Sequence, residues 1–324
     1  MLRSRRLGSF IAAMAVSGST LLQPVFAQDL ITIKLASAQN SLGSLPLVIA
    51  EQKGFFAQEG IKIETIDFKG GAPAVQALAA GSVDACICAA DHAVRLRARN
   101  QGGTILVALT ERHGYGLVAL SSSPAKELSD LKGKPVGITS AGSLTDNTIR
   151  YFIKEANLNP DRDFQLIGVG TGGPMRAAIE SGSVAAGMLT TPDVQAALGA
   201  DGKFKLIQDY RRLQYPALDL VVVERWLKAN PESARKLASA VVRAEKLMQT
   251  DPAAVSAGLE KMFPALKPEL RKVLAEEAPK LASANGRIER GGYDLMIKML
   301  KVADPTLSSP TYESITAFDY LPKN

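Results

Sequence analysis

One segment of the chain occurs twice, and this repeat limits the possible folds more than any other feature. Residues 71–85 match residues 172–186 at an offset of 101 without a gap, and both copies run from Gly-x-Pro to Gly-Ser-Val. The prolines suit the first turn of a helix, while Gly81 and Gly182 suit a left-handed C-terminal cap. Each copy predicts a helix followed by a strand, so we expect two similar lobes rather than one long sheet.

Strand and helix signals alternate around both copies. In the first half, strands are expected at 31–37, 61–68, 85–90 and 105–110, and helices at 45–59 and 73–80. The second copy adds a helix at 143–156 and a strand at 164–169, and mainly helical sequence follows, with helices at about 230–250, 268–281 and 292–302. This alternation predicts an α/β fold in which each lobe holds a mostly parallel sheet flanked by helices.

The N-terminus reads as an export signal. Arg3, Arg5 and Arg6 precede an apolar run at 7–22, and Val-Phe-Ala at 25–27 resembles a cleavage site. A membrane anchor is the alternative, but the run is short and diluted by Ser, Thr and Gly. We expect a signal peptide over 1–27, cleavage after Ala27 and a periplasmic mature protein, by the secretory or the twin-arginine route.

Charge and cysteine content exclude several other classes. Removing the three arginines of the signal lowers the net charge from +6 to +3, and no long basic run follows, so nucleic-acid binding is not expected. Cys86 and Cys88 are the only cysteines; on one strand their side chains point the same way, which favours two core thiols over a disulfide. With only His92 and His113 in addition, neither a zinc site nor any cofactor is expected.

Several motifs together resemble a known family. Residues 46–50, 53–56 and 59–63, then 130–137 and 226–231, are similar to the periplasmic substrate-binding proteins of ABC importers that serve nitrate, sulfonates, taurine or the pyrimidine precursor of thiamine. The resemblance implies a type II-like periplasmic binding fold, with two lobes that close on a small molecule like a Venus flytrap. It implies no enzymatic activity, and delivery of the ligand to a membrane permease.

The same resemblance implies a division of the chain. Two crossing segments are expected near 111–115 and 214–218. The first lobe would combine 28–112 with about 225–324, and the second would comprise 113–224. We expect a monomer.

The ligand is expected at the carboxyl ends of the strands, where open α/β sheets bind their ligands. Loops at these ends that begin helices also offer free amides and a positive dipole end, which attract anions. The candidates in the first lobe are Ser37, Gln39, Asn40, Gly71, Ala72, Asp91 and His92. Those in the second are Gly142, Ser143, Thr171, Gly172, Thr190 and Asp193, with Tyr215 beside the second crossing.

Several candidates have a structural explanation as well. Ser143 can serve as a helix N-cap and still contact a ligand. Asp91 and Asp193 occupy corresponding loops and could recognise an amine or a ring N–H, or act only as cap or turn residues. His92 is expected beside the pocket rather than on the ligand. Tyr215 could stack on a ligand or pack in the hinge.

Two enzyme classes compete with this interpretation. Residues 168–173 fit the dinucleotide fingerprint G-x-G-x-x-G after a strand and before a helix. However, Asp193 follows a proline instead of ending the next strand, the first copy lacks the fingerprint, and an export signal argues against a nicotinamide enzyme. A hydrolase would need a histidine base from only two histidines, and no G-x-S-x-G motif is present.

Overall fold

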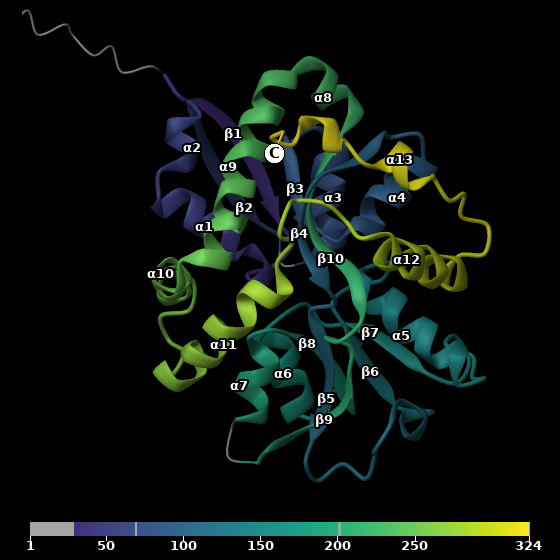
Figure 1. The fold of residues 1–324 in the computed structure, drawn as a ribbon. Coiled ribbons are helices and arrows are strands. Elements are labelled where there is room, and N and C mark those ends of the chain that lie inside the picture. Colours follow the sequence, from purple (N-terminus) through teal and green to yellow (C-terminus); the bar gives the residue numbers. More distant parts are fainter. Residues whose placement is uncertain (1–28, 69, 200–201, 324) are drawn as a thin grey trace, which may run out of the picture.

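The computed structural model describes residues 29–68, 70–199 and 202–323, so the expected signal peptide lies outside the described residues. Two separate five-stranded sheets, each flanked by helices, form the molecule (Figure 1). This confirms the expectation of two α/β lobes from the repeat. Within the described ranges, none of the helices has the length and apolar character needed to cross a bilayer.

The first sheet has the strand order β2-β1-β3-β10-β4. Its members are β1 (Ile31–Ser37), β2 (Ile61–Asp67), β3 (Ala85–Cys88), β4 (Gly103–Arg112) and β10 (Gln214–Val223). Strand β1 pairs in parallel with β2 and β3, whereas β10 runs antiparallel to both of its neighbours. Four of the five strands therefore share one direction.

The second sheet repeats this arrangement in the order β7-β6-β8-β5-β9. Its members are β5 (Tyr115–Leu120), β6 (Pro135–Ile138), β7 (Gln165–Gly168), β8 (Ala186–Thr190) and β9 (Phe204–Asp209). Strand β6 is parallel to β7 and β8, and β5 is antiparallel to β8 and β9. The position of β5 matches that of β10 in the first sheet.

Strands β5 and β10 run antiparallel to their neighbours. Each of them follows a short segment in which the chain crosses from one sheet to the other. Only His113 and Gly114 separate β4 from β5, and residues 210–213 connect β9 to β10. Strand β10 pairs in the first sheet, although the expected second lobe reached residue 224. A division between the lobes at about residue 213 fits the sheet membership better.

Thirteen α-helices and three short 3-10 helices lie within the described ranges. Those before the second sheet are η1 (Leu42–Ser44), α1 (Leu45–Gln52), α2 (Phe55–Gln58), α3 (Gly71–Ala80) and α4 (Ala90–Ala98). Those of the second repeat are η2 (Leu128–Leu131), α5 (Leu144–Glu155), α6 (Gly173–Glu180) and α7 (Asp193–Leu198). The C-terminal set is α8 (Glu224–Ala229), α9 (Pro231–Thr250), α10 (Pro252–Met262), α11 (Pro268–Leu281), α12 (Arg290–Ala303), α13 (Tyr312–Ile315) and η3 (Phe318–Tyr320).

Helices α4 and α7 were not anticipated, so Asp91, His92 and Asp193 lie in first helical turns and not in loops. Two further differences concern the first lobe. The helix expected at 45–59 is broken into α1 and α2, because Gly54 takes a left-handed φ of 69°. Helix α10 was not anticipated; it packs tightly against α1, where a Cβ on Gly258 would lie 2.6 Å from Leu45. The chain after α10 leads into α11, which lies beside α6 and α7 of the second lobe (Figure 1).

The repeat ends as the sequence indicated, with Gly81 and Gly182 at φ values of 78° and 75°. Cys86 and Cys88 are buried free thiols in β3, which confirms the expectation of core cysteines. The fold thus places two similar sets of strand-end loops opposite each other.

Candidate functional site

A cavity of about 750 Å³ is lined by loops of both sheets. From the first lobe it receives Gln39, Asn40 and Asp67 at the ends of β1 and β2, together with Met262 at the end of α10 and residues 263–266 before α11. From the second it receives residues 169–174 after β7 and the segment from Thr190 to Asp193 after β8. Six predicted residues meet here: Gln39, Asn40, Thr171, Gly172, Thr190 and Asp193.

The lining of this cavity contains both acidic and basic side chains, among them Asp193 and Arg176. Burial raises the pKa of Asp193, and the positive charge of Arg176 opposes that increase. Asp193 also lies beside the glycine turn, since a Cβ on Gly172 would be 3.4 Å from its Oδ2. The cavity can therefore supply hydroxyl, amide, carboxylate and guanidinium groups to one small molecule.

A smaller pocket of about 20 Å³ lies deeper between the lobes and brings together Gln39, Gly71, His92, Tyr115 and Ser143. Tyr115 donates a short hydrogen bond from its hydroxyl to Oε1 of Gln39, joining β5 to the loop after β1. A Cβ on Gly71 would lie 2.3 Å from Nε2 of His92, so only glycine fits against this ring. Burial lowers the pKa of His92, which favours its neutral form.

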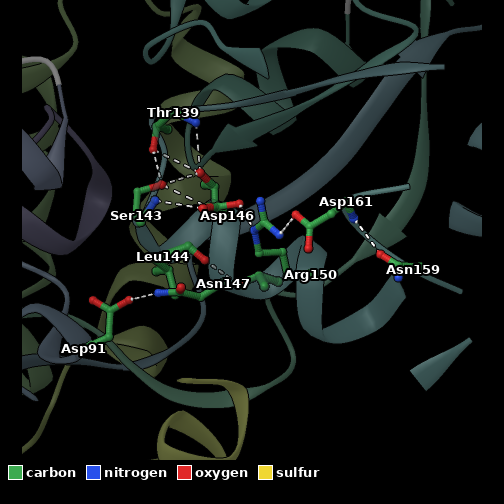
Figure 2. A network of polar contacts seen from close by, with 12 residues as sticks. Asp91, Thr139, Ser143, Leu144, Asp146, Asn147, Arg150, Asn159 and Asp161 are labelled. Atoms are coloured by element: carbon green, nitrogen blue, oxygen red, sulfur yellow. Dashed lines mark hydrogen bonds and ion pairs between the residues drawn. The ribbon is translucent and has the colours of Figure 1, made fainter. Parts of the chain in front are cut away.

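Asp91 lines neither of these cavities and bonds instead to the other lobe. Its Oδ2 accepts a 2.6 Å hydrogen bond from Nδ2 of Asn147 on α5 (Figure 2), while Oδ1 of Asn147 accepts one of 2.7 Å from Arg95. Asp91 and Asn147 are both fully buried or nearly so. The predicted ligand residue thus holds two helices of different lobes together.

Ser143 acts as the N-cap of α5, one of the two roles expected for it. Its Oγ accepts from the amide of Asp146 at 3.5 Å and from the hydroxyl of Thr139 at 2.8 Å (Figure 2). The amide of Gly142 donates to the Asp146 carboxylate at 2.7 Å, and that of Ser143 donates to the carbonyl of Ser140. These helix-start groups are already used within the second lobe, which leaves few of them for a ligand.

Tyr215 packs in the crossing region. It is completely buried, and its ring lies edge-on to His113 with 5.5 Å between ring centroids. This arrangement corresponds to the hinge-packing alternative. Four predicted residues line none of the cavities described here, namely Ala72, Asp91, Gly142 and Tyr215, whereas Ser37 lines a separate groove of the first lobe.

Sequence reasoning missed several residues that the fold brings to the cleft. Tyr115 and Asn147 contact the first lobe only because their strand and helix face it, and no local pattern marks them. Residues 262–266 were missed with helix α10. Arg176 could have been found, because it falls in the first turn of a helix after a candidate loop.

No cluster of three or more metal-ligating side chains exists among the residues that the structure describes.

Comparisons with known proteins agree with this architecture. A family model described as NMT1/THI5 like matches residues 42–255. A solved structure from Bordetella bronchiseptica RB50 is 27% identical with a TM-score of 0.80, covering 90% of this chain and 96% of that one. The periplasmic aliphatic sulphonate binding protein SsuA from Escherichia coli has a TM-score of 0.68 at 19% identity, covering 88% and 91%. The fold is that of the periplasmic binding proteins.

The sequence relatives carry two kinds of description. YtlA of Bacillus subtilis, described as a binding protein, is 23% identical over 231 residues, which are 70% of this chain and 69% of that protein. A 4-amino-5-hydroxymethyl-2-methylpyrimidine phosphate synthase of Aspergillus parasiticus is 26% identical over 224 residues. That match covers 64% of each protein, slightly less than two thirds of the synthase.

Proposed function

Because the chain belongs to the NMT1/THI5-like family, we propose that it is the extracytoplasmic solute-binding component of an ABC importer. It captures a small organic molecule, such as a sulfonate, a carboxylate or a pyrimidine, and delivers it to a membrane permease. The observation that carries this proposal is the 750 Å³ cavity, which is lined by strand-end loops from both of two similar sheets. A ligand that contacts both linings favours closure only as far as it binds the closed state better.

The proposed ligand contacts are divided between the lobes. Gln39, Asn40, Gly71 and His92 act from the first lobe, and Thr171, Gly172, Thr190 and Asp193 from the second. Ser143 and Tyr115 complete the deeper pocket. Residues 28–112 with about 214–324 move as the first lobe, and about 113–213 as the second.

The protein binds its ligand without altering it. A hydrolase of the Ser-His type needs a histidine base beside its nucleophile. His113 is buried with both ring nitrogens engaged, and Nε2 of His92 lies against the backbone of Gly71. Residues 169–173 of the glycine-rich segment line the interlobe cavity, which we assign to the small solute. Some relatives are described as pyrimidine synthases. The decisive test is therefore whether the bound ligand is released unchanged.

Thermal-shift screening tests the binding role. The panel holds nitrate, taurine, alkane sulfonates, aromatic carboxylates and aminopyrimidines. A ligand at 100 times its Kd stabilises the native state by about 2.7 kcal/mol, which raises the melting temperature by several degrees. Mass spectrometry of the bound molecule after release is expected to return it unchanged. A panel without binders, or a molecule converted on the protein, would contradict the proposal.

Export is tested separately. The mature protein is expected to begin at Gln28 and to lie in the periplasm, because residues 1–27 have the pattern of a cleaved signal. Intact-mass measurement of the protein from a periplasmic extract gives the first residue. Retention of residues 7–27 in that soluble protein would rule out the proposed processing.

A further inference from the structure

A separate cavity of about 570 Å³, here called the tail cavity, lies in the first lobe. Its walls come from α9, from Asn285 and Arg287 after α11, and from the C-terminal tail between Phe318 and Lys323. It shares no lining residue with the interlobe cavity. Figure 1 shows the C-terminus beside α9, at the end of the first lobe that points away from the second. A molecule in the tail cavity is therefore separate from a solute in the cleft.

The walls of the tail cavity are fixed to β4, the edge strand of the first sheet. The amide of Ala108 donates to the carbonyl oxygen of Gly286 at 2.8 Å, and the amide of Ala317 donates to that of Ile105 at 2.9 Å. Gly286 has a φ of 73°, and a Cβ there would lie 2.9 Å from Val242, a buried residue of the lining. The tail cavity is thus enclosed by packed segments.

The charged side chains of the tail cavity are mostly positive. Arg235, Arg287 and Lys323 line it together with one acid, Asp319, so the lining has a net charge of +2. None of the three cations forms an ion pair with an acidic side chain in the part of the chain that the structure describes, whereas six other arginines do. Like charges around one cavity repel one another unless an anion lies between them.

Aromatic rings hold two of these cations in place. The guanidinium of Arg287 lies 5.3 Å from the centre of the Phe318 ring, and that of Arg235 lies 4.8 Å from the centre of the Tyr320 ring. Arg235 also donates a hydrogen bond of 2.8 Å to the carbonyl oxygen of Asp319. A guanidinium has five N–H donors, and their planar arrangement suits the oxygens of phosphate and carboxylate groups. Most of these donors remain for a ligand or for water.

We propose that the tail cavity is a second binding site of this protein and takes a phosphate dianion, as inorganic phosphate or as a phosphomonoester group. The dianion matches the net charge of the lining, and its oxygens can accept from both guanidiniums and from the ammonium of Lys323. An anion with a single charge would leave half of the excess positive charge uncompensated. The site acts independently of solute capture, because its lining belongs to one lobe.

Calorimetry on the mature protein at low ionic strength tests this site. The probes are inorganic phosphate, glycerol 3-phosphate and vesicles that contain phosphatidic acid, which distinguish a free from a membrane-borne source. Sulfate and chloride are the reference anions. Phosphomonoester binding is expected to weaken between about pH 8 and about pH 5.5, because the dianion takes up a proton with a pKa of about 6. Sulfate stays a dianion and should bind alike at both pH values, and chloride should bind more weakly.

Matched variants locate the anion. Arg235→Gln and Arg287→Gln each remove one positive charge and should lower the affinity for phosphate about tenfold or more. Asp319→Asn removes the acid of the lining and should raise that affinity, which loss of a merely structural residue would not do. Arg99→Gln, at an exposed arginine outside the tail cavity, is the control for the lost charge. Urea unfolding of each variant shows whether it is folded.

The outcomes separate this site from the cleft. Binding of the vesicles alone would support the site and assign it to a lipid headgroup. Affinity that stays unchanged in Arg235→Gln, Arg287→Gln and Asp319→Asn would overturn the inference, as would the absence of binding by all three phosphate probes at millimolar concentration. A loss of phosphate binding only in Arg176→Gln would also overturn it, because the anion then lies in the interlobe cavity. The thermal-shift panel tests the proposed function separately.

Discussion

The amide of Asn147 lies between Asp91 and Arg95, donating to the carboxylate at 2.6 Å and accepting from the guanidinium at 2.7 Å. Asp91 and Arg95 are one turn apart on α4 of the first lobe, and Asn147 belongs to α5 of the second (Figure 2). The Nδ2 and Oδ1 atoms of Asn147 thus both have hydrogen-bond partners in the other lobe. Further interlobe bonds join Leu42 N to Thr191 O and Gln195 to Glu277.

Asn147→Leu is expected to weaken the closed state. The substitution keeps the side-chain size but leaves the buried Asp91 carboxylate without this donor, at a cost of about 1–3 kcal/mol. Affinity for a solute that requires closure should fall roughly tenfold or more. Calorimetry on the variant, with exposed Lys154→Ala on the same helix as a control, measures this. Unchanged affinity would mean that the contact does not contribute to closure.

Gly71→Ala should destabilise the protein by about 1–3 kcal/mol through overpacking, because the added Cβ would lie 2.3 Å from Nε2 of His92. His92→Ala removes that obstacle, so the double variant should lose less than the sum of the single changes. Urea unfolding of the wild type, the two single variants and the double variant gives the free energies of unfolding for this double-mutant cycle. Additive losses would show that the Gly71 backbone and the His92 ring do not press on each other.

His113 is expected to make the protein sensitive to acid. Its Nδ1 accepts from the amide of Tyr115 at 3.2 Å; its Nε2 lies 2.9 Å from Oγ1 of Thr148, whose hydroxyl donates to Leu144 O. The ring is therefore neutral with its proton on Nε2, and burial lowers the pKa of His113 to about 3.

A histidine whose folded pKa is lowered stabilises the fold fully above its unfolded value of about 6.5. That contribution disappears as the pH falls from 6.5 towards 3. His113→Phe should flatten this part of the curve of unfolding free energy against pH, while lowering stability near neutrality. If wild type and variant show the same slope between pH 6.5 and 4, the histidine is not the source.

Glu111 acts in the opposite direction. Burial raises the pKa of Glu111 to about 7, although its Oε2 accepts a 3.0 Å hydrogen bond from the amide of Glu289. An acid with a raised folded pKa stabilises the fold fully below its unfolded value, and this stability is lost as the pH rises from about 4.5 through 7. Burial also raises the pKa of Asp219 and that of Glu245.

Glu111→Gln should therefore lose less stability between pH 5 and pH 8 than the wild type loses. The amide oxygen of the new side chain can still accept from Glu289. Chemical unfolding at both pH values gives the two differences. An equal loss in both proteins would show that Glu111 is already ionised at pH 5.

The sequence predicted the two repeated segments of this fold better than the segments outside them. Residues 71–85 and 172–186 each contain a complete helix–turn–strand signal, and both form as expected in separate sheets. The expected second lobe extended to residue 224 and so included β10, whereas β10 pairs with β3 and β4, more than 100 residues earlier in the chain. The break at Gly54 depended on one backbone torsion that glycine permits but does not require.

The site was predictable to the extent that the strand-end rule applies. It brought Asn40, Thr171 and Asp193 to one cavity, since these loops follow strands directly. It failed for Asp91, whose partner Asn147 is 56 residues away and is chosen by how the lobes meet.

The distance between the lobes, measured in solution with and without solute, tests the central claim most directly. Spin labels on Lys62→Cys in the first lobe and Lys126→Cys in the second, both exposed positions, report this distance by pulsed electron resonance. Addition of a solute that raises the melting temperature should replace a broad distribution by a shorter and narrower one. An identical distribution in the free and the saturated protein would contradict capture by closure of the two lobes.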